Sequence, residues 1–180
     1  MSKVLATLVA LAILSVSLAF TNQDDTKKYG YIGSDKCGMC HKKDADGNQL
    51  KVWQESAHAK AYKNLAAKNA EAVKNEACLK CHATGAGADA SLNDKKFSIE
   101  DGVQCEACHG PGSEYKSMKV MKDQKAAVEN GLIVYADEAA IKTQCLTCHL
   151  DTNKPEGHAK AGDFDFAAKY AKIKHNKPAK

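Results

Sequence analysis

The chain has 180 residues and a formal net charge of +4, and it contains no arginine, so its 26 strongly basic residues are all lysines set against 22 acidic residues. Leu, Ile, Val and Phe account for only 22 of residues 20–180, about 14%, whereas below about 20% a chain normally cannot bury enough apolar surface to fold alone. The composition therefore argues against a core made only of side chains, and the near-balance of charge argues against nucleic-acid binding.

Residues 1–19 have the pattern of a secretory signal peptide. Lys3 precedes an uncharged, mostly apolar run, and the small residues Ser17 and Ala19 precede a plausible cleavage point. We expect cleavage after Ala19, which would leave residues 20–180 as one domain in the periplasm. A retained membrane anchor is the alternative interpretation.

All eight cysteines fall into four Cys-Xaa-Xaa-Cys-His pentads. This pentad is the attachment signal for haem c, in which both thiols form thioethers to the porphyrin and the histidine binds the iron. A zinc knuckle or a redox disulfide would not require a histidine after each second cysteine. The sequence therefore predicts four covalent haem c groups and no disulfide, at Cys37-Cys40-His41, Cys78-Cys81-His82, Cys105-Cys108-His109 and Cys145-Cys148-His149.

The segments between the pentads are helical in pattern. We expect a first helix over 49–77, after a cap at Asp46-Gly47-Asn48, and a second over 115–129, which ends at Asn130-Gly131. A third should run from a cap at Asp137 into the fourth pentad, and a fourth over 164–174. Residues 84–93 and 151–163 read as loops. No alternating strand pattern is present, so the predicted fold class is mostly α, with short helices and loops wrapped around four haems.

The four irons need distal ligands as well as pentad histidines, and the chain has only three further histidines: His58, His158 and His175. At most three haems can therefore have two histidine ligands. His58, in an apolar and aromatic helix, and His175, at the end of the last helix, are the stronger candidates. Met118 and His158 are the weaker ones, and an iron without a second ligand is the remaining alternative.

The chain resembles the cytochrome c-554 family of tetrahaem proteins. The resemblance rests on Trp53-Gln54-Glu55-Ser56-Ala57-His58-Ala59-Lys60-Ala61, on the third pentad followed by Gly110-Pro111-Gly112, and on a C-terminal histidine. It implies that His58 is the distal ligand of the third haem, that His175 is that of the fourth, and that the haem at His82 is five-coordinate. The family's distal histidine for the first haem is missing here. Met118 stands nearly at that place, so Met118, His158 or no residue would serve the first haem.

The resemblance implies electron transfer in the periplasm between a redox protein donor and acceptor, with no enzymatic activity of its own. We expect a protein that is soluble after signal cleavage, favours the monomer and makes at most peripheral contact with membrane redox complexes. One alternative function is binding or reduction of a small molecule such as nitric oxide at the five-coordinate haem. Another is a subunit of an electron-conducting assembly in which His158 or His175 reaches a neighbouring chain.

Overall fold

A computed structural model describes residues 29–159 and 162–176. The predicted signal peptide lies outside these residues. Within them the chain forms helices and loops and no strand, which confirms the mostly α fold class. The α-helices are α1 (Ser34–His41), α2 (Gln49–Glu55), α3 (Ala61–Lys68), α4 (Glu76–His82), α5 (Glu106–His109), α6 (Met118–Met121), α7 (Gln124–Glu129), α8 (Glu138–His149) and α9 (Phe166–Tyr170).

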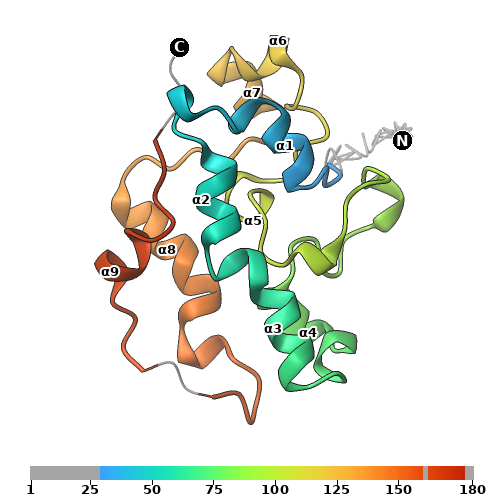
Figure 1. The fold of residues 1–180 in the computed structure, drawn as a ribbon, viewed down its shortest axis with the longest axis vertical. Helices are drawn as coiled ribbons and strands as arrows, with labels where there is room; N and C mark the ends of the chain where they lie inside the picture. Colours follow the sequence, from blue (N-terminus) through green and yellow to red (C-terminus); the bar gives the residue numbers. More distant parts are fainter. Residues whose placement is uncertain (1–28, 160–161, 177–180) are drawn as a thin grey trace, which may run out of the picture.

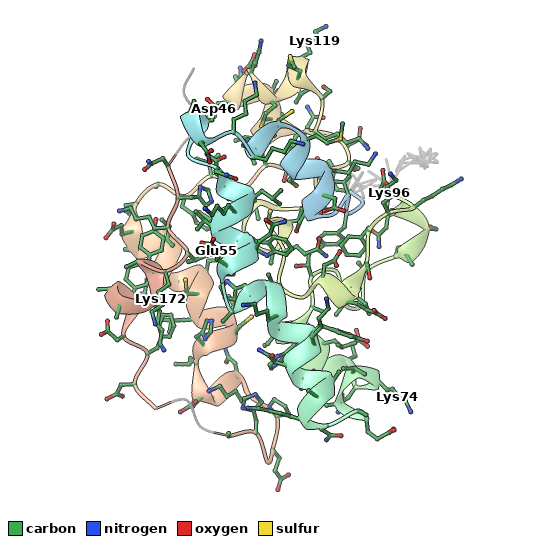
Figure 2. The ribbon with its side chains drawn as sticks, viewed as in Figure 1. Asp46, Glu55, Lys74, Lys96, Lys119 and Lys172 are labelled. Atoms are coloured by element: carbon green, nitrogen blue, oxygen red, sulfur yellow. The ribbon has the colours of Figure 1, made fainter. Side chains whose placement is uncertain are left out.

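The arrangement places distant parts of the chain next to each other. Figure 1 shows α2 along the long axis, with α8 and α9 to one side of it and α1, α6 and α7 near one end. Charged residues such as Lys74, Lys96 and Lys119 lie on the outside of the molecule (Figure 2). No helix in the described part of the chain is long and apolar enough to cross a membrane.

Two of the predicted helix starts are confirmed. The side chain of Asn48 accepts a hydrogen bond from the backbone N–H of Lys51 and caps α2. The side chain of Asp137 accepts one from the N–H of Ala140 at 2.8 Å and caps α8. Each cap satisfies a backbone donor that has no partner inside its helix.

The long helix expected over 49–77 is wrong in its continuity. The Ser56 backbone is extended, and its hydroxyl donates to the Trp53 carbonyl at 2.6 Å, so α2 ends at Glu55. The chain then continues through the 3-10 helices η2 (His58–Lys60) and η3 (Ala72–Lys74), which alternate with α3 and α4. The helix expected over 115–129 is also divided, because Asp123 is extended and caps α7.

The polypeptide buries few apolar residues. In the described part of the chain these are Ile32, Ala72, Leu79, Ala83, Tyr115 and Ala127. The largest fully buried side chain is polar, that of Gln104. Since domains of this size normally enclose a continuous apolar core, this small core agrees with the expectation that bound groups complete the interior.

Candidate metal centres

Each pentad ends its helix at the histidine, although Cys105 of the third pentad lies just before α5 as its N-cap. His41, His82, His109 and His149 are the last residues of α1, α4, α5 and α8, respectively. The two cysteines of a pentad are three positions apart, which on a helix places them on one face. All eight thiols are free of disulfides. Each helix can therefore present two thiols and an imidazole to one bound group.

The seven histidines, all in described residues, form three pairs and leave one over. The ring centres are 6.0 Å apart for His58 and His149, 6.1 Å for His82 and His158, and 5.8 Å for His109 and His175. Every pair joins one pentad histidine to one histidine outside the pentads. The remaining histidine is His41.

This spacing fits a metal ion shared by two imidazoles. An imidazole nitrogen binds a metal ion at about 2.0 Å and the ring centre lies about 1 Å behind it, so rings on opposite sides of one ion have centres about 6 Å apart. The ring planes are tilted by 38–45° to each other. Two imidazoles on one ion can adopt this angle, because each ring can rotate about the axis through the ion and its ligand nitrogen. The donor set and spacing therefore suit iron porphyrin tethered through the pentad cysteines.

Hydrogen bonds orient three of these rings. Nδ1 of His82 lies 3.4 Å from the carbonyl oxygen of Ala61, Nδ1 of His158 lies 2.7 Å from that of Ala159, and Nδ1 of His175 lies 3.3 Å from that of Asn176. A carbonyl only accepts, so Nδ1 carries the proton in each bond. Nε2 is then the nitrogen with a free lone pair, as a metal ligand requires.

The protonation of the buried rings also favours ligation. Burial lowers the pKa of His58 and His109, and the facing ring lowers each further. Burial is likewise the largest cause of the lowered pKa of His41 and His149. These imidazoles are therefore held in the neutral form, which is the form that binds metal.

The ring partners differ from those implied by the family resemblance. His58 faces His149 of the fourth pentad instead of the third, and His175 faces His109 of the third instead of the fourth. Backbone contacts hold His58 beside the segment that precedes the third pentad, yet its ring faces the fourth pentad. Val103 N–H donates to the His58 carbonyl at 3.0 Å, and Gly102, at φ +78°, approaches so closely that a Cβ there would lie 2.6 Å from that oxygen.

The two weaker ligand candidates have different surroundings. His158 faces His82, the histidine that the resemblance would leave without a partner. Met118 begins α6 and is 65% exposed, so it is not a packed core residue. A role for Met118 at the first haem stays a prediction.

Two buried polar residues that the sequence analysis missed hold the first and third pentads together. The Glu106 carboxylate accepts hydrogen bonds from the backbone N–H groups of Ile32, Gly33 and Gly112 at 2.7–3.1 Å. Burial raises the pKa of Glu106, and these three bonds oppose the rise. The available signal was a charged residue between the two cysteines of a pentad.

Gln104, on the other side of Cys105, completes this contact. Its Oε1 accepts from both the N–H and the hydroxyl of Ser34 at 2.8 and 3.1 Å, and its Nε2 donates to the Ser98 carbonyl. Ser34 is the first residue of α1, the helix of the first pentad. The two pentads are thereby positioned by the polypeptide itself.

The cysteines show which pentads adjoin. A hydrogen bond with Cys105 is the largest cause that raises the pKa of Cys37. Burial, followed by the neighbouring Cys145, raises the pKa of Cys108 to about 11. Burial, followed by Cys148, raises that of Cys81 to about 11. These pairs place the first pentad next to the third, the third next to the fourth, and the fourth next to the second.

The second pentad opens onto a cavity of about 540 Å³. Cys78 and His82 line it from α4, Leu65 and Lys68 line it from α3, and residues 155–159, including His158, line it from a loop. Small-molecule and cofactor sites typically measure about 300–1,000 Å³. This cavity has the size and the donor groups for a bound cofactor.

A helical chain with repeated Cys-Xaa-Xaa-Cys-His pentads and opposed imidazoles has the features of a c-type cytochrome. Residues 36–110 match the family described as cytochrome c554 and c-prime. The chain is also 26% identical to cytochrome c-554 of Nitrosomonas europaea over 164 residues, which cover 80% of this chain and 66% of that protein. The two matches confirm the resemblance to the cytochrome c-554 family. No solved structure matches the chain.

Proposed function

We propose that the chain is a tetrahaem c-type cytochrome that carries electrons between redox proteins in the periplasm. The observation that carries this proposal is the pairing of three pentad histidines with three histidines from elsewhere in the chain, at about 6 Å in each case. Iron porphyrin bound at these sites supplies a reversible one-electron couple. The chain's own residues tether, ligate and space the sites.

The arrangement of the pentads supports a carrier. Neighbouring pentads adjoin in a single series, with Cys37 beside Cys105, Cys108 beside Cys145, and Cys81 beside Cys148. The first and second sites form the two ends of this series. We propose that a donor protein docks near one end and an acceptor near the other.

The test is to produce the full chain in a host that exports and matures c-type cytochromes. Mass spectrometry and a pyridine haemochrome assay should count four covalent haems, and the periplasmic fraction should contain them. All four should be reduced and reoxidised reversibly in a potentiometric titration. As a matched control, Cys78→Ser with Cys81→Ser should lower the haem count by one. A wild-type count well below four would overturn the proposal.

Binding of a small molecule is the second candidate function. The ring pairs favour the first site for it, instead of the site at His82 that the family resemblance implies. Because His82 faces His158 while His41 is the histidine left over from the three pairs, the iron open to a ligand such as nitric oxide is proposed at the first site. Carbon monoxide binding to the reduced holoprotein measures this, with one of four haems expected to respond.

A further inference from the structure

The second pentad has a complete set of axial donors in this chain. His82 ends α4, and His158 lies in the loop that follows η6 (Asp151–Asn153). Their ring centres are 6.1 Å apart and their planes are tilted by 38°. This matches the other two pairs closely, at 5.8 and 6.0 Å, so the pair has the same geometric fitness for a shared iron.

Both rings of this pair are oriented by backbone carbonyls. Nδ1 of His82 donates to Ala61, and Nδ1 of His158 donates to Ala159. Nε2 is thus the lone-pair nitrogen on both rings. Such second-shell hydrogen bonds are the usual means by which proteins set the ring orientation of a metal ligand.

The cavity provides independent support. His82, Cys78 and His158 line the same space of about 540 Å³, together with Pro155 and Gly157 of the loop. A loop histidine on the surface alone would not share a cofactor-sized cavity with a thiol and the histidine of one pentad. The loop therefore brings His158 to the second site and not to the first.

The polar group beside the first pentad is an amide. Gln49 is buried, and its Nε2 donates to the carbonyls of Asp46 and Asn176. Its Oε1 is buried without a hydrogen-bond partner. Within the described residues His41 has no facing histidine ring, whereas each of the other three pentad histidines has one.

We propose that His158 is the second imidazole ligand of the haem at His82, so that the shortage of histidines falls on the haem at His41. This inference rests on the proposed function, since it assumes four covalent haems. The inference leaves the haem at His41 with an open coordination position and gives the haem at His82 two histidine ligands.

The experiment compares wild-type holoprotein with His158→Ala. Electron paramagnetic resonance and resonance Raman spectra should show one high-spin haem of four in the wild type and two in His158→Ala. Added imidazole should return the variant to one. His58→Ala, which opens the fourth site, should give the same gain as a positive control. Thr152→Ala, in η6 and outside the cavity lining, should leave the wild-type spectrum unchanged. An equal high-spin count in wild type and His158→Ala would overturn the inference, and so would a wild type with no high-spin haem.

A second measurement identifies the haem. In the reduced wild-type protein, nuclear Overhauser contacts should join the His158 ring protons to the thioether groups at Cys78 and Cys81. Contacts to the thioethers at Cys37 and Cys40 would overturn the assignment. Haem counting on the same samples separates the two hypotheses: fewer than four haems contradicts the proposed function, whereas four haems with unchanged spin states contradicts only the role of His158.

Discussion

The third and fourth pentads are held in opposite ways. Helix α5 has only four residues, yet Glu106 within it is buried and bonded to three backbone N–H groups. Helix α8 has twelve residues and none of them is buried. Helix length is therefore a poor guide to how firmly a pentad is held, because what matters is the long-range bonding of the segment.

Carbonyl acceptors at the end of α5 strengthen this contrast. The carbonyls from 107 to 110 all receive hydrogen bonds from other segments, from Gln144, Tyr135, Ile133 and Tyr115. In α8, the bonds to other segments in the described part of the chain include Gln144 to Ala107 and the ion pair of Glu138 with Lys174. We infer that the polypeptide forms the third site, whereas the fourth depends on its haem.

The largest expected effect follows from removing one haem at a time. In Cys145→Ser with Cys148→Ser, the amides of α8 should lose hydrogen-exchange protection on the order of 100-fold, because an isolated helix of this length is only marginally stable in water. In Cys105→Ser with Cys108→Ser, the amides of Ile32, Gly33 and Gly112 should keep most of theirs. Exchange followed by mass spectrometry measures both. If α8 and the amides around Glu106 lost equal protection in their respective variants, the third and fourth pentads would not differ in how they are held.

Loss of the Glu106 carboxylate should destabilise the protein by about 3–5 kcal/mol, since Glu106→Ala leaves three buried N–H groups without acceptors at about 1–3 kcal/mol each. Glu106→Gln should cost less, because an amide oxygen still accepts. Glu138→Ala in α8 is the control, with an exposed side chain and an expected cost below about 1 kcal/mol. Denaturant unfolding of the holoproteins gives these values, and similar midpoints for the two alanine variants would refute the prediction.

Tyr115→Phe should have a smaller effect of about 1–2 kcal/mol. The change removes the hydroxyl that donates to the Gly110 carbonyl at 2.7 Å and to that of His109 at 3.2 Å. Tyr170→Phe is the matched change, at a residue of α9 whose ring stacks on Phe166. It should cost less than about 0.5 kcal/mol. Thermal unfolding compares them, and a larger loss from Tyr170→Phe would reverse the order predicted here.

The smallest effect is expected for Lys174→Gln. It removes the ion pair with Glu138 at 3.3 Å, in which both side chains are more than half exposed, so the loss should be below about 1 kcal/mol. High salt should remove most of the difference from wild type, because exposed charges are screened. Unfolding at low and high ionic strength tests this, and a salt-independent loss would indicate that Lys174 acts in another way.

The local features of this protein were readable from the chain. The four pentads, the helix starts at Asn48 and Asp137, the end of α7 before Asn130 and the limit of three imidazole pairs all depend on neighbouring residues or on counts. The interruptions at Ser56 and Asp123 were missed. They arise because one side chain competes for a backbone group that a helical pattern would assign to the helix.

The choice of ring partners required the tertiary structure. His58 meets His149 and His158 meets His82 across 91 and 76 positions of the chain, and the Glu106 carboxylate reaches Ile32 across 74. The positions of residues along a chain show which side chains can bind metal or donate a hydrogen bond. They do not show which of several equivalent partners each side chain contacts. Contacts between remote segments decide that, since they depend on the path of the whole backbone.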